Sequence, residues 1–192
     1  MSNPKLSFIV PVYNRPGEVE ELLTSLTAQT DSDFELVLVE DGSDQDSKSV
    51  VDRFSDQLTI HYYFKENAGP SIARNYGIER AGGDYFLFVD SDCILPDHYV
   101  ATVRNFLIDN PNIDAFGGPD KADQQFNVLQ KSISYSMTSF LTTGGIRGGK
   151  KQVDKFYPRS FNLGFSRKVY DTIGGFPKTR LHPGEDMILA IE

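Results

Sequence analysis

Short apolar runs alternate with helical patterns over the first hundred residues, and this alternation most constrains the fold. The runs are rich in β-branched residues and nearly continuous, as expected of strands that are covered on both faces. We predict four such strands, at Leu6–Val12, Phe34–Val39, Leu58–Phe64 and Tyr85–Val89.

Three helices are predicted between these strands. Their apolar residues recur with helical spacing at Val19, Leu22, Leu23 and Leu26, at Val50, Val51 and Phe54, and at Ile72, Ala73 and Tyr76. Asn14 is the expected N-cap of the first helix, and Pro16 lies in its first turn. Strands and helices in this order predict right-handed crossovers and a doubly wound α/β domain, in which a mostly parallel central sheet carries helices on both faces.

The pattern is looser beyond residue 97. We predict a helix near 97–109, a strand at Ile113–Gly117, a helical stretch at 123–141, a returning strand at 160–166 and a helix at 167–176 that is closed by glycines. The segment 142–155 is rich in Gly and Lys and should form a loop. An exposed loop and a lid that closes over an anionic ligand are equally favoured for it.

Length and charge limit the class of protein. A chain of 192 residues with 39% apolar residues has the usual size of one domain. Its net charge of −8 and a pI near 4.9 argue against nucleic acid as a partner. Cys93 is the single cysteine, which excludes an intramolecular disulfide framework and fits a reducing compartment, and we interpret it as a packing residue.

The two ends of the chain bear on location. The first residues lack a secretory signal, and no apolar run has the length of a spanning helix, so we expect a cytoplasmic protein. The last residues, PGEDMILAIE, begin a helical pattern that nothing ends, so we expect the natural chain to continue. Such a continuation is where we expect any membrane association.

Three Asp-x-Asp triplets occur in the chain, at 31–33, 44–46 and 90–92, and position decides among them. In open α/β sheets ligands bind beyond the carboxyl ends of the strands. The first triplet precedes a strand and reads as a turn, whereas Asp44 and Asp46 resemble turn and N-cap residues of the next helix. Only Asp90 and Asp92 directly follow a strand, so this pair is the candidate ligand site.

The carboxylates of Asp90 and Asp92 suit a hard cation such as Mg²⁺ or Mn²⁺ beside a diphosphate. The alternative interpretation is a solvated turn in which Asp92 caps the helix that starts after Pro96. Three histidines, at 61, 98 and 182, are too scattered to indicate a zinc site.

Other residues at the predicted strand ends favour the same edge. Pro11 and Tyr13 lie at the end of the first strand and can wall a flat ring, and Asp41 lies at the end of the second and can accept hydrogen bonds from the edge of a base. After the third strand, Gly69 allows close approach of the backbone, and Arg74, in the first turn of the next helix, favours phosphate. Each residue alone is more simply a turn residue, but together they indicate a nucleotide site.

The chain resembles the family 2 glycosyltransferases, which are inverting enzymes of the GT-A fold. The resemblance is carried, in order, by SFIVPVYNRPGEVEELLTSLTAQT, FELVLVEDGSDQDS, NAGPSIARNYGIERAGGDYFLFVDSDCILP, FNLGFSRKVYDTIGGF and GEDMIL. Each motif is loose, but five in the right order cover most of the chain. The resemblance implies a single GT-A catalytic domain over 1–192, with a nucleotide-binding part at about 1–95 and an acceptor and catalytic part at about 96–192.

The resemblance also implies roles for single residues. Pro11, Tyr13 and Asp41 would hold the nucleoside, with Glu40 beside Asp41. Arg74 would contact the nucleotide, Asp90 the ribose side, and Asp92 the metal ion, Mn²⁺ or Mg²⁺, that bridges the diphosphate. The implied catalytic base is Asp186, with Glu185 as its neighbour, and His182 is a candidate to complete the metal shell.

These roles describe one in-line displacement. A divalent cation stabilises the charge that grows on the leaving diphosphate, and a carboxylate removes the proton of the incoming sugar hydroxyl. We therefore predict a metal-dependent inverting glycosyltransferase that uses a nucleotide sugar, UDP-linked by expectation. The acceptor would be a glycan or lipid-linked sugar in cell-surface polysaccharide biosynthesis, at the cytoplasmic side of the membrane.

Two alternatives stand beside this prediction. A sugar-nucleotide pyrophosphorylase would want a Gly-rich basic loop after the first strand, where VYNRPGEVEE offers one Arg among acidic residues. A nucleotide-sugar-binding module without catalysis is the other, and the presence of both Asp92 and Asp186 weighs against it.

Overall fold

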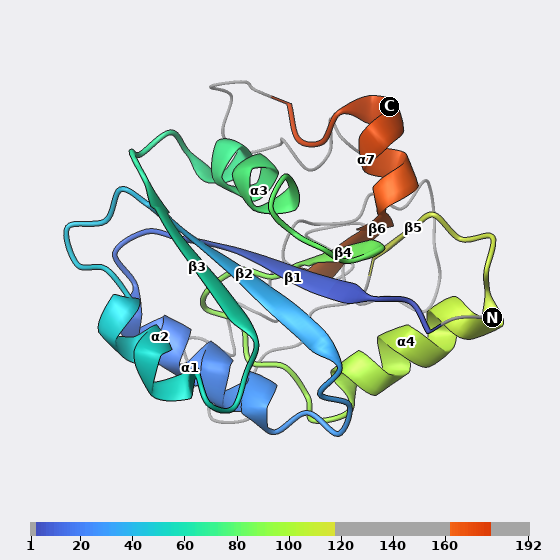
Figure 1. Ribbon diagram of the computed structural model, residues 1–192, viewed down its shortest axis with the longest axis horizontal. Helices are drawn as coiled ribbons and strands as arrows, with labels where there is room; N and C mark the ends of the chain where they lie inside the picture. The colour runs from blue at the N-terminus through green and yellow to red at the C-terminus, as the bar shows by residue number, and fades with distance from the viewer. Residues whose placement is uncertain (1–2, 118–161, 178–192) are drawn as a thin grey trace, which may run out of the picture.

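The computed structural model describes residues 3–117 and 162–177, which form one six-stranded sheet with helices on both faces (Figure 1). The strands are β1 (Leu6–Val12), β2 (Phe34–Asp41), β3 (Ile60–Lys65), β4 (Tyr85–Phe88), β5 (Ala115–Gly117) and β6 (Leu163–Ser166). The helices are α1 (Pro16–Thr27), α2 (Lys48–Phe54), α3 (Pro70–Ile78), α4 (Tyr99–Asp109) and α7 (Arg167–Ile173). The predicted doubly wound, mostly parallel sheet is confirmed.

The strand order, β3-β2-β1-β4-β6-β5, determines where a ligand is able to bind. Strands β1 to β4 are parallel, whereas β6 runs antiparallel to both β4 and β5. After β1 the chain proceeds outward to β2 and β3, and then crosses back to place β4 on the other side of β1. The order therefore reverses between β1 and β4, and the crevice beyond their carboxyl ends is the expected ligand position.

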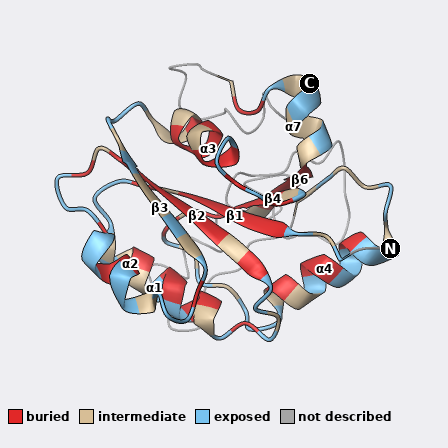
Figure 2. Ribbon diagram, viewed as in Figure 1, coloured by how far each residue is buried: buried red, intermediate tan, exposed pale blue. Residues whose placement is uncertain are grey.

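Two apolar layers enclose the sheet. Helices α1, α2 and α4 cover one face, and α3 and α7 cover the other (Figure 1). Side chains alternate along β1, so that Phe8 packs into the first layer and Ile9 into the second, both fully buried. Strands β1, β2, β4 and β6 are buried along most of their length, whereas the edge strands β3 and β5 are partly exposed and the outer surfaces of the helices are exposed (Figure 2). Burial on both faces explains why the strand sequences are continuously apolar.

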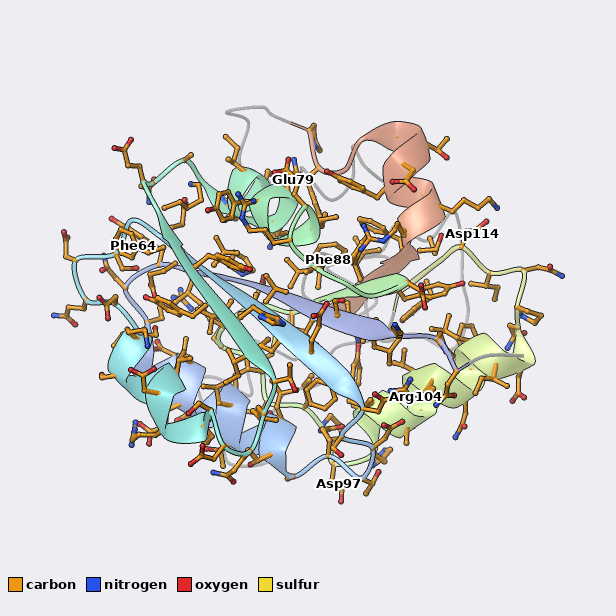
Figure 3. All side chains as sticks on the ribbon, viewed as in Figure 1. Phe64, Glu79, Phe88, Asp97, Arg104 and Asp114 are labelled. Atoms are coloured by element: carbon orange, nitrogen blue, oxygen red, sulfur yellow. The ribbon has the colours of Figure 1, made fainter. Side chains whose placement is uncertain are left out.

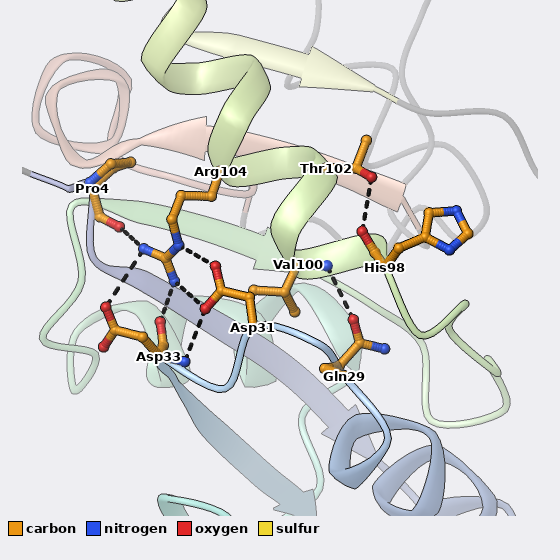
Figure 4. A network of polar contacts seen from close by, with 8 residues as sticks. All are labelled: Pro4, Gln29, Asp31, Asp33, His98, Val100, Thr102 and Arg104. Carbon is orange, nitrogen blue, oxygen red and sulfur yellow. Dashed lines mark hydrogen bonds and ion pairs between the residues drawn. The ribbon is translucent and has the colours of Figure 1, made fainter.

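The first Asp-Ser-Asp triplet has a structural role at the opposite edge of the sheet (Figure 4). The guanidinium of Arg104, on α4, is almost fully buried and donates from Nε to Asp31 Oδ2 at 2.6 Å. It also donates to the backbone oxygens of Pro4 and Asp33. These bonds join α4 to the segments that enter β1 and β2, so the turn predicted at 31–33 also anchors a helix.

Helix α4 excludes the interpretation of Asp92 as its cap. The N-cap residue is His98, and its side chain makes no capping bond. The first-turn N–H of Val100 donates instead to Gln29 Oε1, at 3.0 Å (Figure 4). Asp92 thus has no part in starting this helix.

Three local predictions need correction. Asn14 is not the N-cap of α1, because Arg15 takes that position. Strand β2 extends two residues further than predicted and includes Glu40 and Asp41, because both pair in register with β3. Arg74 is the fifth residue of α3 and so lies in its second turn, because the helix begins at Pro70.

Other predictions are untested. The helix at 123–141, the loop at 142–155 and the residues from 178 onward lie outside the described residues, so what was expected of them remains a prediction. Within the described part of the chain, no helix is long and apolar enough to cross a membrane.

Candidate active site

A cleft of about 990 Å³ opens at the carboxyl ends of β1, β2 and β4, where the strand order reverses. The loops after β1, β3 and β4 and the start of α3 form its walls. It is lined by Pro11, Val12, Tyr13, Arg15, Asp41, Asn67, Ala68, Gly69, Pro70, Ile72, Arg74, Asp90, Ser91 and Asp92. The volume is that of a typical small-molecule site.

Asp41, the last residue of β2, is held firmly at the floor of this cleft. Its carboxylate accepts hydrogen bonds from the N–H groups of Ala68 at 3.0 Å and Gly69 at 2.8 Å, and from Lys65 Nζ. The backbone oxygen of Asp41 accepts from Asn67 Nδ2. Only 4% of Asp41 is exposed, so its orientation is determined by the loop that leads into α3.

Glu40 lies behind the cleft and does not line it. It is fully buried, and its carboxylate accepts from Ser43 Oγ and from the Ser47 N–H at 2.9 Å. Tyr62 contacts the same carboxylate, and burial, followed by the charges of Glu40 and Asp46, raises the pKa of Tyr62. Glu40 therefore holds the β2–α2 loop. Its contact with a nucleotide stays a prediction.

Asn14 joins that loop to the β1–α1 loop. Its backbone has a positive φ of 54°, a conformation that Asn tolerates better than most residues. Its Oδ1 accepts from the N–H groups of Asp44 and Gln45, and its own N–H donates to Ser43 Oγ at 2.7 Å. The side chain that was expected to cap a helix therefore fixes the β1–α1 loop, which lines the cleft, to the β2–α2 loop, which does not.

Asp90 is paired with a buried cation. Arg74 Nη2 donates to Asp90 Oδ1 at 2.9 Å, and the Arg74 side chain is 4% exposed. The guanidinium also lies 5.3 Å from the ring centre of Phe176. The neighbouring Asn75 donates to the Phe176 backbone oxygen and accepts from its N–H, both at 2.8 Å. Arg74 is thus set in place from two sides.

Asp92 is paired with an exposed cation. Arg15 Nη1 lies 2.6 Å from Asp92 Oδ2, and the two side chains are 48% and 51% exposed. The pair joins the turn after β4 to the start of α1 at the mouth of the cleft. The two carboxylates of the triplet therefore have unlike partners, one buried and one in solvent.

The described residues provide few ligands of their own for a metal ion. No three His, Cys, Asp or Glu side chains gather to hold one within residues 3–117 and 162–177. Mg²⁺ and Mn²⁺ are, however, often held by one or two carboxylates together with phosphate oxygens and water. Asp90 and Asp92 at the wall of an open cleft fit that kind of site, which a ligand's phosphates would complete.

The structure thus brings six of the predicted residues to one cleft, and these are Pro11, Tyr13, Asp41, Arg74, Asp90 and Asp92. Asp186, Glu185 and His182 lie outside the described residues. Sequence reasoning missed Arg15, Lys65 and Asn67 as members of the site. Their signal was present, because Arg15 lies two residues after Tyr13, Asn67 lies two residues before Gly69, and Lys65 is the last residue of β3.

Comparison with known proteins agrees with this geometry. The sequence profile of glycosyl transferase family 2 matches residues 7–174. The chain belongs to this family. Family 2 membership favours the transferase prediction over the pyrophosphorylase alternative.

Two of the sequence relatives are much longer proteins. An uncharacterized glycosyltransferase of Rickettsia bellii is 30% identical over 138 residues, which are 72% of this chain and 20% of that protein. The glycosyltransferase GlyA of Streptococcus pneumoniae is 39% identical over 106 residues, 55% of this chain and 15% of that protein. The segments that match this chain thus span only a fifth or less of the length of these two proteins.

Solved structures place the fold among the GT-A glycosyltransferases. TarS of S. aureus, in complex with UDP-GlcNAc, is 25% identical with a TM-score of 0.75, over 97% of this chain and 52% of that one. The mannosyltransferase PcManGT of Pyrobaculum calidifontis, in complex with GDP-Man and Mn²⁺, is 21% identical with a TM-score of 0.69, over 97% and 50% of the two chains. These neighbours bind nucleotide sugars.

Proposed function

We propose that the protein is a metal-dependent, inverting glycosyltransferase that takes its sugar from a UDP-linked donor. The observation that carries the proposal is the convergence of Asp41, Arg74, Asp90 and Asp92 on one cleft at the reversal of strand order. A cleft with a carboxylate at its floor and a carboxylate pair at its wall suits a base at one end and a diphosphate at the other.

The nucleoside end is supported by Asp41 and its surroundings. The carboxylate of Asp41 already accepts two backbone N–H groups and an ammonium, so it is fixed in orientation. A carboxylate has about four acceptor positions, which leaves one for the imide N–H of a uracil. Pro11 and the half-exposed Tyr13 line the cleft and offer flat apolar surface to the ring.

The diphosphate end is supported by Arg74, Asp90 and Asp92. Arg74 is buried and held, so its charge is available at a constant place for the nucleotide. Asp92 is half exposed at the mouth and suits a cation ligand. A cation bound there supplies Lewis-acid stabilisation of the charge that develops on the leaving diphosphate.

The acceptor half of the proposal rests on the resemblance. Asp186 would remove the proton of the acceptor hydroxyl, with Glu185 beside it, and we propose a glycan or lipid-linked sugar as acceptor. The protein would work at the cytoplasmic side of a membrane in cell-surface polysaccharide synthesis. A chain with Cys93 as its single cysteine is compatible with that compartment.

Substitutions in the full-length protein test the donor site. We expect Asp92→Asn to weaken UDP binding in the presence of Mn²⁺ on the order of 100-fold, because the cation loses a charged ligand. We expect Asp186→Asn to leave UDP binding unchanged while it lowers the rate of sugar transfer by roughly 100-fold or more. Titration calorimetry measures the binding, and release of UDP measures the transfer.

Asp33→Asn is the matched control, since it alters the other Asp-Ser-Asp triplet, far from the cleft. It should bind UDP and Mn²⁺ as the native protein does. Tight UDP binding that is indifferent to Mn²⁺ in the native protein would contradict the metal role of Asp92. Normal transfer by Asp186→Asn would exclude that residue as the base.

A further inference from the structure

Arg15 occupies a position at which an arginine does not stabilise the helix. It is the N-cap of α1, and its side chain makes no capping hydrogen bond. Ser, Thr, Asp and Asn are preferred at N-caps, and a cation there faces the positive end of the helix dipole. A residue that violates a local preference without structural gain is a candidate for a functional role.

The bond that Arg15 does make contributes little to folding. Its guanidinium and the carboxylate of Asp92 are 48% and 51% exposed, and exposed ion pairs are weak and easily exchanged. The Arg74–Asp90 pair beside it is different, because Arg74 is 4% exposed and packs on Phe176. Of the two carboxylates in the triplet, Asp92 is therefore the one whose partner is free to leave.

A metal ion that binds Asp92 would compete with Arg15 for the same carboxylate. A divalent cation on Asp92 would lie close to the Arg15 guanidinium, and like charges at that separation repel each other. Both residues line the cleft, so a diphosphate bound there offers the guanidinium a second anionic partner. Phosphate is a good partner for the planar guanidinium, which binds it through two hydrogen bonds.

We propose that Arg15 is an exchangeable counter-ion of Asp92. It neutralises Asp92 while the cleft is empty, and it moves to the diphosphate when a divalent cation takes the carboxylate. The cation and the nucleotide therefore promote each other's binding, since each removes an obstacle to the other. The inference rests on the proposed donor site. It adds that the cation binds weakly when the nucleotide is absent and more tightly when the nucleotide is bound.

Mn²⁺ binding to the full-length protein tests this role without any measurement of transfer. Free Mn²⁺ is counted by electron paramagnetic resonance, with and without saturating UDP. We expect Arg15→Gln to bind Mn²⁺ about tenfold more tightly than the native protein when UDP is absent, because a competing charge is gone. The factor by which UDP increases Mn²⁺ affinity should fall by about tenfold.

Two further variants make the result specific. Arg15→Lys keeps the charge, so in the absence of UDP it should bind Mn²⁺ nearly as weakly as the native protein does. Arg53→Gln removes an equally exposed arginine, which pairs with Glu20 at 2.8 Å away from the cleft, and should leave Mn²⁺ binding unchanged. All three variants should have the same unfolding temperature as the native protein, since neither Arg15 nor Arg53 is buried.

The outcomes separate this inference from the function on which it rests. Unchanged or weaker Mn²⁺ binding by Arg15→Gln, in a protein whose native form binds Mn²⁺ and UDP together, overturns the counter-ion role alone. An equal increase in Mn²⁺ affinity in Arg53→Gln overturns it as well, because the increase would then come from the change in net charge. A native protein that binds neither Mn²⁺ nor UDP overturns the proposed function too.

Discussion

Asp-Ser-Asp occurs at 31–33 and again at 90–92, and the arginines that pair with Asp31 and with Asp92 differ in burial. Asp31 pairs with Arg104, whose side chain is 5% exposed. Asp90 and Asp92 face a cleft, and Asp92 pairs with an arginine in solvent. A buried charge cannot give up its partner without a large desolvation cost, whereas an exposed one can. The first triplet is thus structural and the second is available to ligands.

Replacement of Asp31 tests the structural role through pH. Burial acts to raise the pKa of Asp31, but the hydrogen bonds from Arg104 and the Asp33 N–H, with the charge of Arg104, outweigh it and lower the pKa from 3.8. Stability from the pair is therefore complete above this usual pKa and is lost as pH falls through the lowered one. We predict that Asp31→Asn lowers the free energy of unfolding by about 1 to 3 kcal/mol at pH 7, with a smaller difference below pH 3.8.

Urea unfolding between pH 7 and pH 3 measures this difference, and Asp33→Asn is its control. The carboxylate of Asp33 is 80% exposed and lies 3.8 Å from Arg104 Nη1. Its replacement should change the free energy of unfolding by less than about 0.5 kcal/mol. Equal losses in the two variants, or a loss in Asp31→Asn that does not vary with pH, would contradict the assignment.

The loop between β3 and α3 is the element that shapes the floor of the cleft. It wraps around the end of β2, where the Asp41 carboxylate binds the N–H groups of Ala68 and Gly69. The wrapping is tight at Gly42, which has a φ of 74°. A Cβ on Gly42 would lie 2.5 Å from the backbone nitrogen of Asn67, closer than real contacts allow. Glycine is therefore required at position 42 for two reasons, the positive φ and the close approach of the Asn67 backbone.

Gly42→Ala tests whether this close approach forms the cleft. We predict a loss of about 2 to 3 kcal/mol in the free energy of unfolding, from the strained φ and from the displaced Asn67 backbone. UDP binding should also weaken, because the N–H groups that orient Asp41 move with the loop. Chemical denaturation and titration calorimetry measure the two effects.

Gly17→Ala provides the comparison, because Gly17 lies in α1 and a Cβ there meets nothing within 4 Å. Alanine should stabilise the helix by about 0.5 to 1 kcal/mol and leave UDP binding as it was. Native stability and UDP affinity in Gly42→Ala would show that the loop tolerates a side chain, contrary to the geometry.

At the scale of the whole molecule, antiparallel pairing of β4 with β6 unites two distant parts of the chain. Phe88 of β4 is fully buried and packs on Phe165 of β6 and on Phe176 beyond α7, with ring centres 4.8 Å and 4.9 Å apart. Phe88 lies in the interior of the molecule, whereas Phe64 lies on the edge strand (Figure 3). Two residues after Phe88, Asp90 begins the candidate metal-binding turn.

We predict that Phe88→Ala lowers the free energy of unfolding by about 3 to 5 kcal/mol, because it leaves a cavity where the two parts meet. Circular dichroism and tyrosine fluorescence should report the same single transition, since one sheet joins both parts. Phe106→Ala, which removes a ring that is 37% exposed on α4, should cost about 1 kcal/mol. Separate transitions for the two probes in the native protein would contradict the united core.

Much of the α/β arrangement follows from local pattern. Runs such as Leu6–Val12 are too short and too apolar to be anything but buried strands, and the positions at Val19, Leu22 and Leu26 repeat with helical period. Because Asp90 and Asp92 directly follow one of these strands, the pattern also assigns them to the edge of the sheet where ligands bind. Asn14 shows the limit, because a cap and a loop contact look alike in sequence.

The sequence by itself thus determined the order of the elements, the edge of the sheet at which the cleft opens and the triplet that lies there, because each depends on patterns within a few residues. Only the tertiary structure decided the partners of the charges. Arg15 meets Asp92 across 77 positions of chain, and Arg104 meets Asp31 across 73. Local patterns carry no information about such distances, since the sheet order that joins these segments is a property of the whole core.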